Sequence, residues 1–342
     1  MALFGANASG KSTVLRALSF LAWFARDSVT LNPDIPLPYE PFKDAASWQQ
    51  PTRLCVHFTG PTDPSLEAAD QQYSVYEYEL MLSNDPNSPH QVLRETLRRQ
   101  PEGRGRFHRV FERQGSTIQS SDSWFRIGAF ESVTLRKTAS AISTLAQLGH
   151  QPSLKLREVS QRVLTNILSE RFEPRDEDAS RYYLSNPQLL ERVNREIERI
   201  DLGIRSVKPN SDNAKDEVVF MHQGLGMPMR WSGESHGTRA LLRYFPLIDY
   251  ALENGGVAVI DELDASIHPM VVEEVFRWFI DPERNRYDAQ LWLTCHNASL
   301  LHELQKEEIL LCEKSMDGQA LVYSLTAIAS VRRDDNFYKK YV

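Results

Sequence analysis

Eight consecutive residues near the start of the chain form a pattern that is typical of polyphosphate binding. Gly5-Ala-Asn-Ala-Ser-Gly-Lys-Ser12 matches G-x-x-x-x-G-K-[ST], and apolar residues at helical spacing follow it. The glycines let backbone N–H groups turn toward phosphate oxygens, and the N-terminus of the following helix adds positive potential. Lys11 would reach the β- and γ-phosphates, and the Ser12 hydroxyl would bind Mg²⁺. The candidate phosphate-binding residues of the loop are Gly5, Asn7, Ala8, Ser9, Gly10, Lys11 and Ser12.

A loop of this kind needs a buried strand in front of it, and little chain is available for one. Only Met1-Ala-Leu-Phe4 precedes Gly5. Two explanations stay open: the chain starts inside that strand, or a different strand supports the loop.

A second motif predicts a metal ligand and a base. Val257-Ala-Val-Ile260 follows two glycines and is typical of a buried parallel strand, and Asp261 and Glu262 come directly after it. Asp261 would hold Mg²⁺, directly or through water, and Glu262 would polarise the attacking water as general base. A strand that merely ends in a polar turn is the simpler alternative, and the loop upstream makes it the weaker one.

Two further segments place polar groups next to regular elements. Leu291-Trp-Leu-Thr-Cys-His296 is typical of a strand that ends in a histidine, with Cys295 and His296 on opposite faces. Trp231-Ser-Gly-Glu-Ser-His-Gly-Thr238 precedes a helix expected over 239–252. The Ser235 hydroxyl, the Gly237 N–H and the N-terminus of that helix would form an anion site.

The same segment also matches G-x-S-x-G, the nucleophile elbow of serine hydrolases. Ser235, then Asp261 or Asp264, then His296 even follow the order Ser…Asp…His. An elbow needs an apolar strand immediately before it, and residues 224–230, which include Pro228, do not form one. A serine hydrolase is therefore a remote alternative.

The amino-acid composition limits the classes of protein to which the chain can belong. The 342 residues are 41% hydrophobic and 25% charged with a net charge of −7, which is ordinary for a globular protein and excludes a disordered chain or a polycation. Three scattered cysteines favour a reducing, cytoplasmic setting, and no apolar run is long enough for a membrane span.

The pattern of predicted elements indicates an α/β core that is split in sequence. Strands are expected over 53–58, 73–82 and 107–118, mostly helices over 137–200, and strands again from 217 to a hairpin at 308–325. Within the helical region, 154–168 and 189–200 have the clearest helical spacing. We expect an N-terminal part at 1–136 with an antiparallel β region, a helical insertion at 137–215 and a C-terminal part at 216–342.

Taken together, these motifs resemble a known group of proteins. The loop at 5–12, Glu234–Thr238, Asp261–Pro269 and Thr294–Asn297 are similar to compact ABC-type ATPases grouped with the AAA family, including the RloA-like group and ATPase subunits of anti-phage systems. The ATPase domains of OLD-family nucleases and SMC-type repair proteins are similar in outline. Segments at 76–80, 111–113 and 334–341 add to the resemblance. It implies a P-loop NTPase fold of ABC/SMC-like type.

The resemblance also implies residue roles and partners. ATP and Mg²⁺ would be the cofactors, with Thr13 beside Lys11 and Ser12, and Glu262 would be the catalytic base. His296 would be the switch that senses the γ-phosphate, and Asp264 the residue that crosses a dimer. Ser235 and Gly237 would reach the ATP of a partner subunit, so a homodimer or higher oligomer is expected.

The sequence lacks two features of the similar proteins, a long coiled coil and a nuclease domain, and this limits the kinds of ATPase that we expect. The helical region is too short for the long coiled coil of SMC-type proteins. Only 46 residues follow His296, fewer than a nuclease domain needs, so a separate effector chain is expected to carry nuclease or toxin activity. The resulting hypothesis is an ATP-gated subunit of a bacterial anti-phage or restriction-linked complex.

An arginine-rich stretch leaves a second hypothesis open, an ATP-gated DNA-binding clamp of the repair type. The arginines of residues 94–113 are Arg94, Arg98, Arg99, Arg104, Arg106, Arg109 and Arg113. A solvated hairpin is the simpler interpretation, and a surface for nucleic acid or an acidic partner is the alternative.

Overall fold

The computed structural model describes residues 1–44, 49–63, 72–85, 90–101, 104–200, 203–210, 217–328, 330–332 and 335–338. The segment at 334–341 therefore lies partly outside the described residues. The chain forms two compact units, one from Met1–Leu15 and Leu164–Val342, the other from Arg16–Val163. The three-part division expected from the sequence remains a prediction.

The first unit is built on a six-stranded sheet in the order β13-β12-β1-β11-β10-β7. β1 is parallel to β11 and β12, β10 is parallel to β11, and only β13 is shown antiparallel to its neighbour β12. The bounds are β1 Ala2–Phe4, β7 Val163–Thr165, β10 Val257–Ile260, β11 Gln290–Thr294, β12 Ile309–Lys314 and β13 Ala320–Ser324. All three residues of β1 are almost fully buried, so this short strand itself supports the predicted phosphate loop.

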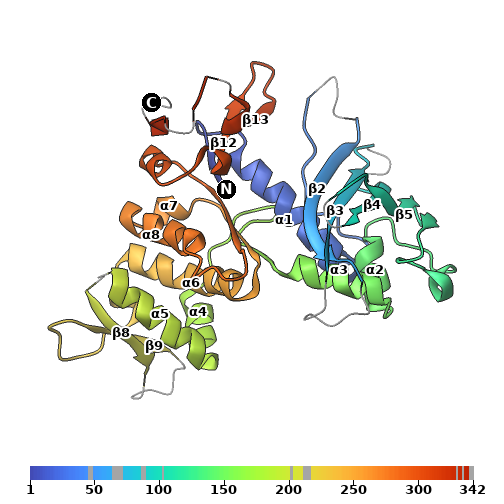
Figure 1. Cartoon of the computed structure of the whole chain (residues 1–342). Coiled ribbons are helices and arrows are strands. Elements are labelled where there is room, and N and C mark those ends of the chain that lie inside the picture. Colours follow the sequence, from blue (N-terminus) through green and yellow to red (C-terminus); the bar gives the residue numbers. More distant parts are fainter. Residues whose placement is uncertain are drawn as a thin grey trace. The chain divides into compact units, whose positions relative to one another are not determined.

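Helices complete this unit. α4, α5 and α6 pack together with the small β8–β9 ribbon (Figure 1). α1 Lys11–Asp27 begins in this unit and belongs to the second unit from Arg16 on. The other bounds are α4 Asp176–Ser185, α5 Pro187–Ile200, α6 His236–Asn254, α7 Leu263–Ser266, α8 Pro269–Ile280, β8 Ile204–Pro209 and β9 Val218–His222. α6 ends at Gly255, which takes the left-handed conformation with φ +64° and leaves no room for a Cβ beside the Tyr287 carbonyl. That turn directs the chain into β10.

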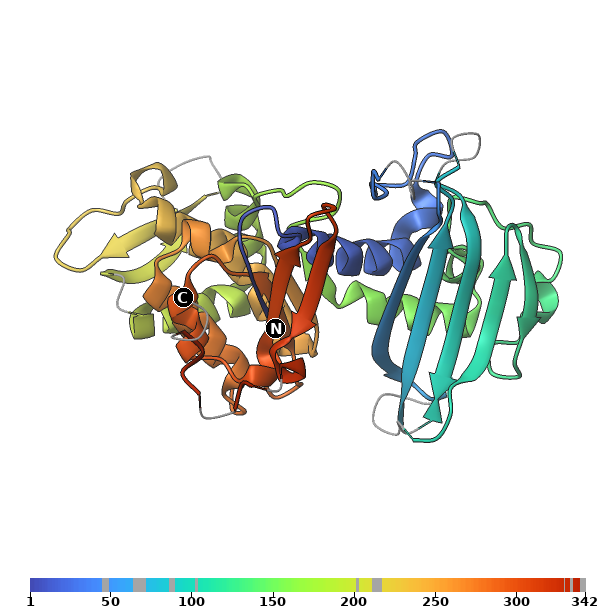
Figure 2. The same ribbon diagram turned by 90° about the horizontal axis from the view of Figure 1, so that it is seen from above.

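The second unit contains an antiparallel sheet in the order β2-β3-β4-β5-β6 (Figure 2). The bounds are β2 Thr52–Pro61, β3 Tyr73–Leu82, β4 Val92–Gln100, β5 His108–Gln114, β6 Thr117–Ser121, α2 Ala141–Gln147 and α3 Gln151–Gln161. One face of the sheet buries Tyr76, Tyr78 and Leu80. On the same face Glu95 and Arg113 form a fully buried ion pair at 3.0 Å, and Glu95 also accepts from Ala141 N–H at the start of α2.

Short 3-10 turns join these elements: Ser28–Thr30, Gly128–Phe130, Trp231–Gly233, Ala298–His302, Lys306–Glu308 and Leu325–Ala327. Among the helices that the structure describes, none combines the length and the apolar character that crossing a lipid bilayer requires.

Most predicted elements are confirmed, and two predictions were wrong or incomplete. The helix expected over 154–168 ends at Gln161, because Asn166 is bound to the backbone of β10 and draws the segment into the sheet as β7. β4 was missed because Arg94 and Arg98 on it pair with glutamates of neighbouring strands, which gives this strand the charge pattern of a solvated hairpin.

Candidate nucleotide-binding site

A cavity of about 450 Å³ opens at the end of β1. It is lined by Asn7, Ala8, Ser9, Gly10, Lys11, Ser12, Thr13, Glu262 and His296. The structure therefore brings most of the predicted phosphate-loop residues into one pocket with the predicted base and the predicted switch histidine. All of them belong to the first unit.

The loop backbone takes a shape that requires its two glycines. Gly5 has φ +151°, and a Cβ built there would lie 2.2 Å from the Cys312 carbonyl oxygen of β12. Gly10 has φ +100°, and its Cβ would lie 2.5 Å from Cβ of Ala320 on β13. Both positions are thus closed to any side chain, and the hairpin β12–β13 packs directly against the loop.

The side chain of Lys11 folds back beneath the phosphate loop. Its side chain is almost buried, and its Nζ donates to the carbonyl oxygens of Gly5 at 2.8 Å and Ala6 at 3.0 Å. An ammonium group has three N–H donors, so a third remains for a ligand. The cation is thereby held at the pocket, where its third N–H could meet a phosphate oxygen.

Asp261 and Ser12 meet as the two motifs predict, although 249 residues separate them. The Ser12 hydroxyl donates to Asp261 Oδ1 at 3.0 Å, and the buried Thr294 hydroxyl donates to the same oxygen at 2.8 Å. Hard oxygen donors suit Mg²⁺, and adjacent ligands of an octahedral Mg²⁺ at 2.0–2.1 Å lie about 3 Å apart. Ser12 Oγ and Asp261 Oδ1 therefore fit a magnesium ion.

The backbone at Asp261 is fixed by a residue that the sequence did not suggest. Asn166 is fully buried; its Oδ1 accepts from Asp261 N–H at 2.8 Å, and its Nδ2 donates to the Asp261 carbonyl at 3.1 Å and to the Tyr244 hydroxyl. Burial raises the pKa of Tyr244 above its ordinary value, so this hydroxyl stays neutral. Asn166 orients the end of β10, and nothing in the local sequence indicates it.

Glu262 takes an uncommon conformation, with φ +56° and ψ +43° in the left-handed region. Its N–H donates to the Thr294 hydroxyl at 2.8 Å, its Oε1 lies 4.0 Å from His296 Nε2, and its Oε2 accepts from Arg171. A non-glycine residue held in this region stores strain, which is found most often at functional sites. Arg171 lies in a turn after β7 and was also missed by the sequence reasoning.

Asp264 holds the turn that carries the histidine. Its Oδ2 accepts from the backbone N–H groups of His296 at 2.6 Å and Asn297 at 2.8 Å. β11 ends at Thr294, so the expected strand does not reach Cys295 and His296; of these two, Cys295 is buried and His296 is exposed. Burial raises the pKa of the Cys295 thiol far above its ordinary value, which keeps it protonated.

Ser235 and Gly237 are not among the residues that line this pocket. The exposed Ser235 is the N-cap of α6, and its hydroxyl oxygen accepts from Thr238 N–H at 3.1 Å. Gly237 lies in the first turn of α6. The proposed contact of both residues with a partner's nucleotide remains a prediction.

The Ser…Asp…His alternative does not form a hydrogen-bonded chain among the described contacts. The Ser235 hydroxyl is paired with Thr238, whereas His296 faces Glu262 in the pocket. A hydrolase nucleophile would need its base within hydrogen-bond reach. The geometry thus favours the phosphate-loop interpretation of these residues.

Comparisons with known proteins agree with this geometry. A family model described as "AAA domain, putative AbiEii toxin, Type IV TA system" matches residues 1–302. No curated protein sequence matches the chain significantly. One solved structure, the SmcHead bound to the C-winged helix domain of ScpA, aligns with a TM-score of 0.46 and 12% identity, over 95% of this chain and 91% of that one. The family match, together with the sheet and the loop, confirms the predicted α/β P-loop fold.

Proposed function

The chain belongs to this family of AAA domains, and on that premise we propose that it binds ATP with Mg²⁺ and hydrolyses it to ADP and phosphate. One observation carries the proposal: the loop from Gly5 to Ser12 meets Asp261, Glu262 and His296 around a single pocket. These groups come from β1, β10 and β11, which are neighbours in the sheet.

Each side chain has a role that follows from its chemistry. The loop N–H groups and Lys11 would bind the triphosphate, with Thr13 at the start of α1. Ser12 and Asp261 would hold the magnesium ion, which supplies charge neutralisation when bound. Glu262 would take the proton of the attacking water, and His296, which faces it, would sense the γ-phosphate.

Arg171 gives the proposed base a resting partner. Its guanidinium is bonded to Glu262 Oε2, and it also approaches Glu173 at 3.8 Å. While Glu262 Oε2 accepts from the guanidinium, this oxygen is not available to the attacking water. We therefore propose that Glu262 exchanges Arg171 for the attacking water when nucleotide binds.

The test is nucleotide binding and phosphate release by Lys11→Ala. We expect this variant to lose most of its affinity for a fluorescent ATP analogue, because the buried ammonium under the loop is gone. Lys155→Ala is the matched control, because Lys155 is paired with Glu158 on α3, outside the pocket. Unchanged ATP affinity in Lys11→Ala, or no phosphate release by the wild type with Mg²⁺, would refute the proposal.

The assembly is the second part of the proposal. Ser235 is exposed at the N-terminus of the 19-residue helix α6, where its hydroxyl and the first N–H groups could bind an anion brought by another subunit. ATP held between two copies would close a homodimer, and hydrolysis would open it. Ser235→Arg should block ATP-dependent dimerisation in light scattering while ATP binding to the monomer persists; retained dimerisation would contradict this arrangement.

The biological role is the third part of the proposal, and its only support is the family. Its description includes a toxin–antitoxin system, which supports an ATP-gated subunit of a bacterial defence complex that controls a separate effector chain. Co-purification from the native host, with and without a non-hydrolysable ATP analogue, tests for that chain. The absence of any ATP-dependent partner would contradict this role.

Four of the seven arginines that suggested a DNA-binding clamp are paired with glutamates. Arg94 and Arg109 pair with Glu112, Arg98 pairs with Glu77, and Arg113 is buried against Glu95. These four present little net positive charge to phosphates, whereas Arg104 and Arg106 are exposed between β4 and β5, so the clamp stays the second candidate.

A further inference from the structure

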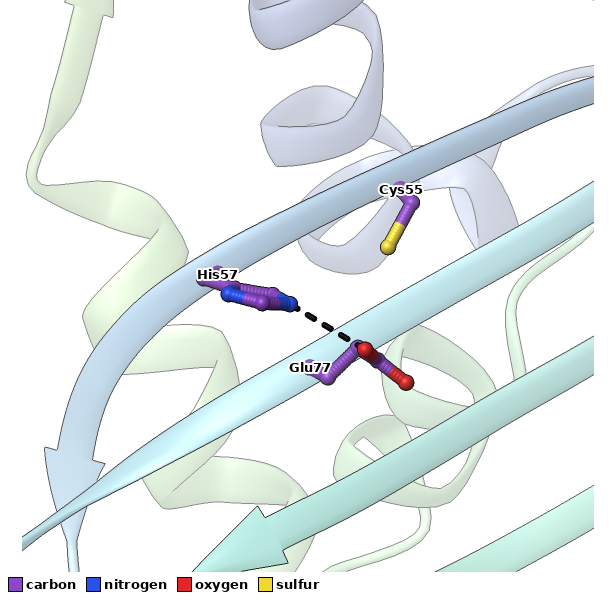
Figure 3. Close-up of side chains that lie close together, drawn as sticks. All are labelled: Cys55, His57 and Glu77. Atoms are coloured by element: carbon purple, nitrogen blue, oxygen red, sulfur yellow. Dashed lines mark hydrogen bonds and ion pairs between the residues drawn. The ribbon is translucent and has the colours of Figure 1, made fainter. Parts of the chain in front are cut away.

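The second unit carries three potential metal ligands on two neighbouring strands. Cys55 and His57 lie two residues apart on β2, so their side chains share one face of the sheet. Glu77 of β3 is the residue directly opposite His57 in the antiparallel register. Figure 3 shows the three side chains close together on this face, and their ligand atoms all lie within 4.8 Å of one another.

The spacing of these atoms suits a tetrahedral ion. His57 Nε2 and Glu77 Oε2 are 3.1 Å apart. These atoms form a hydrogen bond with each other. Two adjacent ligands of a tetrahedral Zn²⁺ at 2.0–2.1 Å lie about 3.3 Å apart, so an ion that replaces the shared proton would find the imidazole and the carboxylate at close to the required separation. Cys55 Sγ lies within 4.8 Å of both ligand atoms.

Neighbouring groups hold the ligands in these orientations. Arg98 of β4 bonds the other oxygen of Glu77, Oε1, which leaves Oε2 directed at His57. The ring of Phe107 lies 5.4 Å from the His57 ring, centroid to centroid. Such outer contacts commonly fix the orientation of metal ligands in proteins.

The charges around the thiol are compatible with a bound cation. Glu79, which is paired with Arg53, lies opposite Cys55 in the register, next to Glu77 on the same face. Partial burial, Glu77 and Glu79 raise the pKa of the Cys55 thiol. Glu77 is likewise paired with Arg98, so both carboxylates already have a cationic partner, and the ion would bind through coordination, which would deprotonate the thiol.

We propose that Cys55 Sγ, His57 Nε2 and Glu77 Oε2 form a binding site for a Zn²⁺-class ion, with the fourth coordination position open to solvent. Sulfur, imidazole and carboxylate together select zinc over magnesium or calcium, which prefer oxygen alone. A site with an open position can accept water or a ligand from a partner chain. This site belongs to the second unit and does not depend on the nucleotide pocket.

Cobalt is the probe, because a thiolate bound to Co²⁺ gives a ligand-to-metal charge-transfer absorption that oxygen ligands do not. The full chain is titrated with Co²⁺ in excess Mg²⁺ and a phosphine reductant, and Zn²⁺ is then added. We expect one Co²⁺ per chain with the thiolate absorption, which Zn²⁺ displaces. No thiolate absorption in the wild type would overturn the proposal.

Matched variants assign the ligands. Cys55→Ser should abolish the thiolate absorption, and His57→Gln and Glu77→Gln should each weaken Co²⁺ binding about tenfold or more. His108→Gln is the control, because His108 is an exposed histidine on β5 of the same sheet. Asp261→Asn should leave the absorption unchanged. Persistence of the absorption in Cys55→Ser, or equal weakening by His108→Gln, would show that the ion binds elsewhere.

Discussion

Replacement of Glu262 by glutamine removes the proposed base and leaves the other side chains of the pocket unchanged. The amide keeps the size of the side chain, and its backbone strain is the same, because glutamine meets the same cost in the left-handed region. The change removes the ion pair with Arg171, in which the two side chains are 32% and 38% exposed. Exposed pairs contribute about 0.2–1 kcal/mol, so the free energy of unfolding should fall by less than about 1 kcal/mol.

The effect on hydrolysis should be far larger than the effect on stability. Loss of a general base typically lowers a rate by about 10²–10⁴, which corresponds to about 3–5 kcal/mol of activation free energy. Lys11, Ser12 and Asp261 are untouched, so ATP should bind as tightly as before and remain unhydrolysed. Phosphate release at saturating ATP, urea unfolding and retention of radiolabelled nucleotide measure the three quantities separately.

Glu173→Gln is the matched control for this variant. Glu173 also lies beside Arg171, at 3.8 Å, but it does not line the pocket. It should hydrolyse ATP at close to the wild-type rate. A Glu262→Gln chain that releases phosphate as fast as the wild type would refute the assignment of the base, and equal slowing by Glu173→Gln would show that Arg171, not Glu262, controls the rate.

Three further predictions concern other parts of the chain. Asn166→Ala leaves the buried backbone of Asp261 without its partners and should lower the free energy of unfolding by about 1–3 kcal/mol in urea titrations; no change would contradict the role of Asn166. Glu95→Gln leaves Arg113 as a buried, uncompensated charge and should lower the free energy of unfolding by about 3–5 kcal/mol in the same titrations. A decrease of less than about 1 kcal/mol would show that water reaches the pair. Cys55 should be the single thiol that reacts in the native state, since the other two are buried. The pKa of the Cys55 thiol is raised, so its thiolate forms only at higher pH. Alkylation of Cys55 at neutral pH should therefore be slower than alkylation of a small model thiol, and it should accelerate as the pH rises. A rate equal to that of the model thiol would contradict the raised pKa.

The parts of the site that could be predicted from the sequence are those formed by motifs of consecutive residues. The phosphate loop is a local pattern, and Asp261 and Glu262 follow an apolar run that is typical of a buried strand. Parallel strands end at one edge of a sheet, which is why motifs 249 residues apart could be expected to meet.

The missed parts depend on contacts that no local pattern encodes. Asn166 and Arg171 reach Asp261 and Glu262 across 95 and 91 residues, from a segment whose apolar spacing was typical of a helix. The alternation of β2 predicts that Cys55 and His57 share a face, but the register that sets Glu77 beside them follows from the pairing of β2 with β3. Charged β4 was missed because its arginines are neutralised only after the sheet forms.

The position of β1 has a consequence for how the chain acquires its nucleotide site. Ala2 pairs with Leu293 on one side and with Ile309 on the other. During translation the phosphate loop is made long before β11 and β12, so its supporting strand has no neighbours until residues 290–314 have been made. Contacts so distant in sequence form slowly, because the intervening chain must be ordered before they bring any gain. ATP should therefore be unable to assist the early stages of folding, and ribosome-bound chains halted before residue 290 should not bind it.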